Sequence, residues 1–187
     1  MKKEYRRWYR IFVAMWLVFV ILFGGAFYDL KERRIPNWWV ASAVLCGLGL
    51  VVLTASEGDS FVMIFSFFLR IGAVILVFFP FFLLRMMGAG DIKMMAVILG
   101  CLGLKAGSLA VGYGFLVGAV LALVKMLLQR NLLKRLSTLF VYLRRLFLTK
   151  EIVPYYIAQR DGGSVVIPFT ACLFLGYLWF LCMTFFI

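Results

Sequence analysis

Six long apolar runs constrain the fold of this chain most strongly, because each has about the length of a helix that crosses the hydrocarbon of a bilayer. Hydrophobic residues make up 65% of the sequence and charged residues only 15%, so most of the surface must face lipid. Lipid leaves exposed backbone groups unsatisfied, which makes runs of this length helical. We predict an all-α, polytopic integral membrane protein with about six transmembrane helices, over residues 11–28, 38–54, 61–84, 86–104, 109–128 and 165–187.

A single membrane-embedded domain over residues 1–187 is expected, because the sequence has no connection long enough for a second core. The basic N-terminus followed by an apolar run resembles a secretory signal. However, the run covers 18 residues, more than the roughly 7 to 15 of a signal sequence. We therefore expect it to stay as the first transmembrane helix.

Residues 129–163 combine leucines at helical spacing with interspersed lysines and arginines. Their uninterrupted apolar stretch is too short to span a membrane. This pattern predicts a basic amphipathic helix that lies along the anionic lipids of the cytoplasmic leaflet. A gate that faces the substrate is the alternative interpretation.

The net charge of +12 is interpreted here as a topology signal rather than as a nucleic-acid site, since Lys and Arg are enriched in cytoplasmic loops. Alternation of six spans places most Lys and Arg residues on the side where the first span ends. That side is predicted to be cytoplasmic, with the N-terminus outside. The basic residues of the N-terminal tail argue against this orientation, so the side of the tail stays open.

Several classes of catalytic site are excluded by composition. The chain contains no histidine, which rules out Cys-His and Ser-His-Asp nucleophile systems and imidazole-bound metals. The cysteines lie within predicted spans without a C-x-x-C pair and are expected to be buried packing residues: Cys46, Cys101, Cys172 and Cys182. No metal and no cofactor is expected.

Carboxylates remain as the groups able to do acid and base chemistry. Asp59 and Asp161 lie in turn-like segments and are expected to be solvated. Asp29 ends the first span, where a carboxylate is also typical of a simple interfacial residue. Asp91 lies inside the fourth span, in "LRMMGAGDIKMM", where an ionisable residue indicates function. The span count places Asp29 and Asp91 at the same face of the membrane.

The residues around Asp91 suggest a close approach by another segment. Gly88 and Gly90 lack a Cβ, so a partner helix or a substrate strand can come near. Lys93 lies about 200° further round a helix and is expected to avoid the face of Asp91. It is expected either to extend towards the headgroups or to face a different helix.

Two such carboxyls within a few ångströms cannot both ionise cheaply, so they are expected to share one proton. The ionised member can then draw a proton from water, while the protonated member hydrogen-bonds a scissile carbonyl and later protonates the leaving nitrogen. An ion- or proton-coupled membrane transporter is the alternative, because paired carboxylates also bind cations. A catalytically inert membrane scaffold is a third interpretation.

Three motifs resemble those of the type IV prepilin peptidase family of G-x-G-D intramembrane aspartyl proteases: "YDLKERRIPNWW" at residues 28–39, "GAGDIK" at 88–93 and "IPFTACLFLG" at 167–176. The resemblance implies that Asp29 and Asp91 are the catalytic pair, at the cytoplasmic border of the bacterial inner membrane. It implies a prepilin substrate. It also assigns motif or substrate-binding positions to Gly88, Gly90, Lys93, Pro36, Asn37 and Pro168.

The chain lacks the cytoplasmic insertion with two C-x-x-C pairs that longer members of that family carry with their N-methyltransferase activity. It is more similar to the short, peptidase-only form associated with tight-adherence pili. The resemblance therefore implies cleavage of a type IVb-like prepilin without methylation. Thr170 and Ala171 stand where longer members often have Gly-Pro.

Overall fold

The computed structural model of the chain describes residues 2–55, 60–129 and 167–186, and single positions at 137, 140, 141, 144 and 148, with side chains from Ile11 onward. All regular structure in this part is helical, which confirms the all-α prediction: α1 (Lys2–Glu32), α2 (Asn37–Thr54), α3 (Ser60–Leu83), α4 (Ala89–Leu102), α5 (Leu104–Leu128) and α8 (Phe169–Phe186). Apart from Gln129 and those single positions, the amphipathic segment expected over 129–163 lies outside the described residues, as do Asp59 and Asp161.

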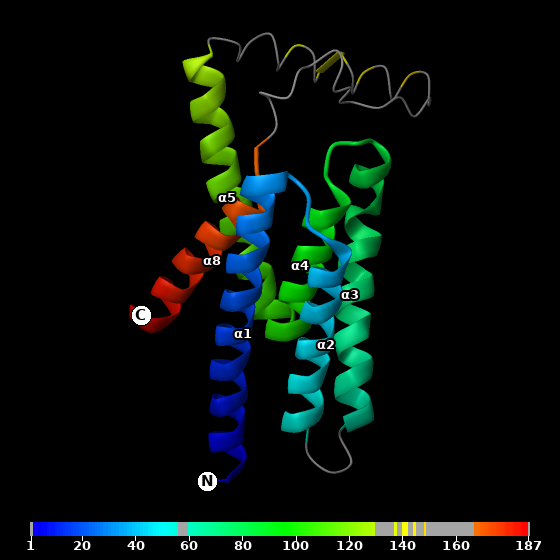
Figure 1. Cartoon of the computed structure of the whole chain (residues 1–187), viewed down its shortest axis with the longest axis vertical. Helices are drawn as coiled ribbons and strands as arrows, with labels where there is room; N and C mark the ends of the chain where they lie inside the picture. Colours follow the sequence, from blue (N-terminus) through cyan, green and yellow to red (C-terminus); the bar gives the residue numbers. More distant parts are fainter. Residues whose placement is uncertain are drawn as a thin grey trace.

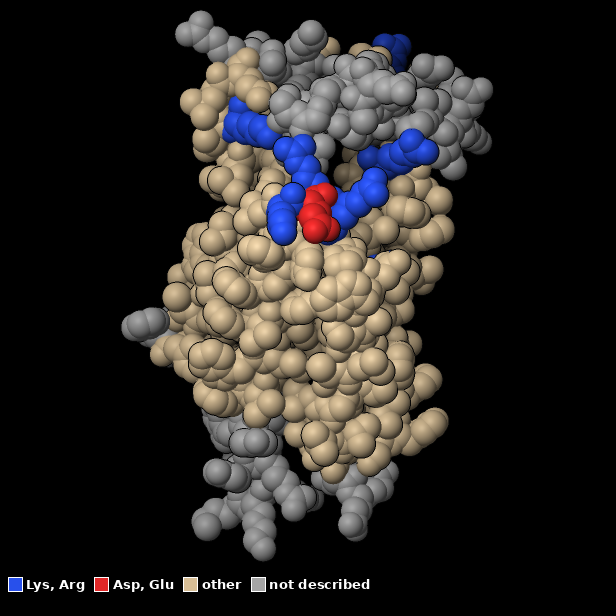
Figure 2. Space-filling view, in the orientation of Figure 1, with Lys and Arg blue, Asp and Glu red and all other residues tan. Residues whose placement is uncertain are grey.

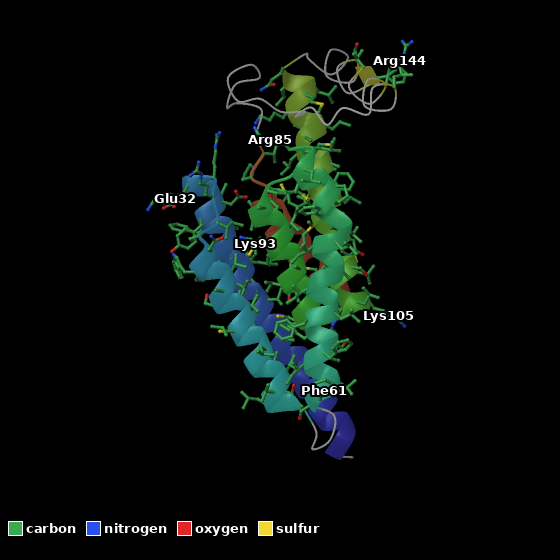
Figure 3. The ribbon with its side chains drawn as sticks, turned by 90° about the vertical axis from the view of Figure 1, so that its right-hand side faces the viewer. Glu32, Phe61, Arg85, Lys93, Lys105 and Arg144 are labelled. Carbon is green, nitrogen blue, oxygen red and sulfur yellow. The ribbon has the colours of Figure 1, made fainter. Side chains whose placement is uncertain are left out.

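The first five helices run alternately up and down along the long axis of the molecule (Figure 1). Glu32, Arg85 and Lys93 consequently lie towards one end, and Phe61 lies at the other (Figure 3). We call the first of these the Glu32 end. The N-terminus of α1 lies at the opposite end (Figure 1). Charged side chains gather towards the Glu32 end of the visible face, and residues other than Lys, Arg, Asp and Glu cover most of the rest of the described surface (Figure 2).

The structure supports the expected spans in part and corrects one of them. Four helical segments in the described part are long and apolar enough to cross a membrane: Ile11–Glu32, Asn37–Thr54, Ser60–Leu83 and Leu104–Leu128. The span expected over 86–104 is instead the 14-residue α4, which extends roughly 21 Å at 1.5 Å per residue. The last expected span, over residues 165–187, corresponds to α8, which is apolar over Phe169–Phe185. The chain is still a multi-pass membrane protein by the length and hydropathy of its helices, and its exposed large apolar side chains include Leu53, Phe61 and Leu76.

Gly103 explains why α4 is short. Its φ of 84° lies in the left-handed region that glycine adopts without strain. The amide of Gly103 closes the last turn of α4 on the carbonyl of Leu99, and Gly103 is also the N-cap of α5. Because one residue both ends α4 and starts α5, α4 stops well before the level of Phe61 (Figure 3).

Helix α4 forms the centre of the bundle. It contacts each of the other described helices, and eight of its residues are buried: Ile92 and the run from Met94 to Gly100. Side chains from α1, α3, α5 and α8 complete the core around it. Asp91 thus stands at the start of the most enclosed helix in the described part.

Helix α8 crosses α5 at a point where each helix has a glycine and so no side chain. A Cβ on Gly176 would collide with the backbone of Gly114, so only small residues allow this approach. On another side, the hydroxyl of Tyr177 donates to the carbonyl of Met15 in α1 at 2.7 Å. These contacts fix α8 against α5 and α1, at a clear tilt to α1 (Figure 1).

The turn between α1 and α2 is held by an aromatic side chain. The ring of Trp39 occupies the space beside Gly24, which a Cβ would fill. Its indole Nε1 donates to the carbonyl of Ile21 at 3.2 Å. Tyr28 packs against the rings of both Trp38 and Trp39. The start of α2 is therefore fixed against the last turns of α1.

The cysteine prediction holds only in part. Cys172 is buried and Cys101 is half-buried, whereas Cys46 and Cys182 are exposed on the bundle surface. The expectation of four buried thiols was wrong, because an apolar side chain in a membrane span can face lipid as easily as core.

Replacing Gly176 by Ala should lower the thermal unfolding midpoint in detergent by several degrees, because the new methyl group meets the backbone of Gly114 rather than a movable side chain. Gly112→Ala in α5 is the matched control, since open space surrounds Gly112. Equal midpoints for the two variants would show that the crossing is not tightly packed.

Candidate functional site

Asp29 lies near the end of α1 and is buried, with 8% of its surface exposed. Its Oδ2 accepts a hydrogen bond from the amide of Thr170 at 2.9 Å, and the amide of Ala171 also donates to this carboxyl. Both amides belong to the first turn of α8, where backbone donors have no partner within the helix. Asp29 therefore caps α8 from a different helix and lies at the positive end of its dipole.

Asp91 lies in the first turn of α4. The N-cap of this helix is Gly88, which has no side chain to satisfy the free amides. Instead, Asp91 accepts a hydrogen bond from the amide of Gly88, as the third residue of a capping box does. A Cβ on Gly88 would lie only 3.1 Å from Oδ2 of Asp91, so this glycine makes room for the carboxyl itself.

Thr170 connects the two carboxyls. Its amide donates to Asp29, and its hydroxyl Oγ1 donates to Oδ1 of Asp91, each at 2.9 Å. The Thr170 side chain is completely buried. Helices α1 and α4, which are far apart in sequence, thus bring both aspartates to the same residue at the start of α8.

Gly90 faces the connection between α1 and α2. A Cβ at Gly90 would lie 3.4 Å from Cβ and Cδ1 of Ile35, which directly precedes Pro36 and Asn37. Of the two neighbours expected beside this glycine, a partner segment and a substrate strand, the structure contains the first. The "IPN" and "GAGD" segments are therefore in direct contact.

Lys93 makes a second link between the same two segments. Its Nζ donates to Oδ1 of Asn37 at 2.8 Å, and it lies towards the Glu32 end (Figure 3). Of the two orientations expected for Lys93, the structure has the one in which it faces a different helix. Pro36 is the N-cap of α2, with an extended backbone, a position where its missing N–H removes no helical bond.

Pro168 precedes the first residue of α8. Its carbonyl accepts hydrogen bonds from the amide and the thiol of Cys172 at 3.3 Å. The hydrogen bond from the amide of Cys172 closes the first turn of α8. Pro168 therefore fixes the point at which the amides of Thr170 and Ala171 become available to Asp29.

Two polar residues were missed by reasoning from sequence. Thr170 was noted only as a departure from a motif, and the available signal was its place two residues after Pro168, at the start of an apolar run. Arg70 lies well inside α3, where its Nε donates to the carbonyl of Ser66 at 2.9 Å. Its guanidinium also lies beside Gly103, at 3.1 Å from the position of a Cβ there. The charge of Arg70 within an apolar run was the available signal.

The arrangement can carry out acid and base chemistry. Every buried side-chain nitrogen or oxygen among the described residues has a hydrogen-bond partner, and Thr170 supplies a donor both to the buried Asp29 and to the partly buried Asp91. Within the described ranges, no group of three or more Cys, Asp or Glu side chains is placed to hold a metal ion. The two carboxyls are the acid and base groups that meet at this site.

One comparison with known proteins bears on the site. The model of the Type IV leader peptidase family matches residues 14–123, a range that contains Asp29, Asp91 and the segments around them. Neither a curated protein nor a solved structure gave a significant match.

Gly90→Leu should lower the thermal unfolding midpoint by several degrees, because the leucine side chain must displace Ile35. The double variant Gly90→Leu with Ile35→Ala should recover much of the loss, since the smaller residue vacates the space. Gly72→Leu is the control, as nothing lies within 4 Å of a Cβ at Gly72. Additive effects of the two substitutions would contradict the contact.

Proposed function

Because the chain belongs to the Type IV leader peptidase family, we propose that Asp29 and Asp91 are the catalytic pair with which it cleaves prepilins. Membership of this family makes the protein an aspartyl endopeptidase that acts as a prepilin leader peptidase. What the proposal adds is the identity of the reacting groups, the mechanism, the class of prepilin and the side of the membrane on which cleavage takes place.

The observation that carries the proposal is the meeting of the two carboxyls at Thr170. Asp29 and Asp91 are 62 positions apart in sequence, yet each accepts a hydrogen bond from this residue at 2.9 Å. Purely interfacial aspartates would face water or headgroups, whereas these two face inwards towards a third helix. Both also lie within the matched range of the family.

In the proposed mechanism, one carboxyl is ionised and the other holds a proton, since two adjacent negative charges repel strongly. The ionised carboxyl takes a proton from a water molecule as that water attacks the scissile carbonyl carbon. The protonated carboxyl donates a hydrogen bond to the carbonyl oxygen. Collapse of the tetrahedral intermediate breaks the C–N bond, and a carboxyl proton passes to the leaving nitrogen. No covalent enzyme intermediate and no cofactor is involved.

The position of the site along the bundle suits a substrate that is cut at a membrane border. A prepilin has a short leader followed by an apolar helix, so its scissile bond lies where that helix meets the headgroups. Asp29 belongs to the last turns of α1, and Asp91 belongs to the first turn of α4. A peptide bond within a helix is shielded, so the segment around the cut must unwind before it reaches the two carboxyls.

We place this border on the cytoplasmic side of a bacterial inner membrane. The Glu32 end carries basic residues in or next to its connections, namely Lys31 in the last turn of α1 and Arg33, Arg34 and Arg85 in the connections, and such residues are enriched in cytoplasmic loops. The same residues would interact with anionic lipids of the inner leaflet. The N-terminus is then on the outer side, against the preference of its own basic residues.

The substrate is proposed to be a small, type IVb-like prepilin, and the reaction to end with cleavage. The chain has no insertion with paired C-x-x-C motifs, the feature that accompanies N-methylation in longer relatives. The transporter alternative receives no support from the family match, and both carboxyls lie near one end of the bundle instead of its midplane.

Asp29→Asn and Asp91→Asn should each abolish leader removal while the protein still inserts into the membrane, because an amide can neither accept the proton of water nor return one to the leaving nitrogen. Glu32→Gln, an exposed acid in the same helix as Asp29, should cleave at the wild-type rate. The assay is co-expression with a prepilin from the same genome and mass spectrometry of the product. Substantial cleavage by either Asn variant would end the proposal.

Orientation can be tested by labelling single cysteines in a background where Cys46, Cys101, Cys172 and Cys182 are changed to Ala or Ser. This background should retain activity, because the thiols have no role in the mechanism. A cysteine at Arg34 should react with a membrane-impermeant reagent only from the cytoplasmic side, and one at Ser56 only from the other side. The reverse pattern would place the site on the outer face.

A further inference from the structure

We propose that Thr170 is a positioning residue that sets the placement of the two carboxyls relative to each other, with its amide fixing Asp29 and its hydroxyl fixing Asp91. This inference rests on the function proposed above. It assigns a role in the reaction to a residue outside the range matched by the family model.

Thr170 presents three separate groups to two other helices. Its amide contacts Asp29 in α1, and its hydroxyl contacts Asp91 in α4, each at 2.9 Å. Its methyl group Cγ2 lies 3.2 Å from the position of a Cβ on Gly25, also in α1. A β-branched side chain has few rotamers, so packing of the methyl group fixes the direction of the hydroxyl.

The two hydrogen bonds differ in what they depend on. The bond to Asp29 comes from the backbone, and it exists for any residue other than proline that continues the first turn of α8. The bond to Asp91 comes from the side chain, and it requires a hydroxyl. Substitution at this one position can therefore remove the contact with Asp91 and leave the contact with Asp29 in place.

Loss of the hydroxyl should affect the chemical step more than substrate binding. Asp91 would keep the amide of Gly88 as a donor. However, that amide belongs to the N-cap of the same helix as Asp91, so it cannot fix the position of Asp91 relative to Asp29. The carboxyl could then turn away from Asp29. Reacting groups that are displaced by a fraction of an ångström lose much of their rate advantage, whereas the surface that binds the substrate helix is unchanged.

The test compares Thr170→Val with Thr170→Ser in the full-length protein, purified in detergent, with a purified prepilin from the same genome that retains its leader and apolar helix. Valine keeps the methyl packing and removes the hydroxyl, while serine keeps the hydroxyl and removes the methyl group. Thr184→Val is the matched control, because the hydroxyl of Thr184 bonds only its own helix at the carbonyl of Phe180, 2.8 Å away.

A positioning role predicts that Thr170→Val lowers kcat by about tenfold or more with little change in KM, and that Thr170→Ser and Thr184→Val stay near wild type. A role in packing alone predicts the reverse order, with serine impaired and valine normal, and that result would overturn the inference. If the valine variant does not fold, Thr170→Ala and Thr170→Ser provide the same comparison, since they differ only in the hydroxyl. Equal kcat values for alanine and serine would also overturn it.

The Asn variants of Asp29 and Asp91, measured in the same assay, separate this inference from the proposed function. If they are inactive and Thr170→Val is fully active, only the role of Thr170 is wrong. If they cleave the prepilin, the catalytic assignment itself is wrong.

Discussion

The backbone contact between Gly114 and Gly176 is the constraint on which the site depends. Helices in lipid gain little from burying apolar surface against one another, so close packing of small residues largely decides where they cross. This crossing and the hydrogen bond from Tyr177 to Met15 together fix where α8 packs along α1. From that position, the first turn of α8 meets Asp29.

One buried carboxyl, Asp29, and one partly buried carboxyl, Asp91, require hydrogen-bond donors in place before any substrate binds. Unpaired buried polar groups are costly, and the first turn of a helix has unused amides. The first amides of α8 have no acceptor within their own helix, and the carboxyl of Asp29 in α1 needs donors. Each therefore satisfies the other. At Asp91, the amide of Gly88 and the hydroxyl of Thr170 play the same part. Folding and assembly of the site are thus the same event.

Much of the fold and part of the site could be predicted from the sequence, because both depend on local patterns. Apolar runs identify helices, and their alternation brings Asp29 and Asp91 to one end. The short α4 was missed because apolar residues continue across Gly103, and only its backbone conformation reveals the break. Thr170 and the pairing of Lys93 with Asn37 depend on which helices meet, and a single sequence contains no direct record of that.

Because the chain reverses direction at Gly103, the bundle is shorter along the membrane normal at α4 than at α1 and α3. Where α4 passes into α5, the protein is shorter than the roughly 30 Å of hydrocarbon, while α1 and α3 continue beyond it. A cavity of about 340 Å³ lies in this region, lined by residues that include Arg70, Gly103 and Thr54, and it has room for several water molecules. A bilayer that thins around such a dent would bring water nearer to the guanidinium of Arg70, which lines this cavity, than its place in α3 suggests. Thin membranes should therefore suit this protein better than thick ones.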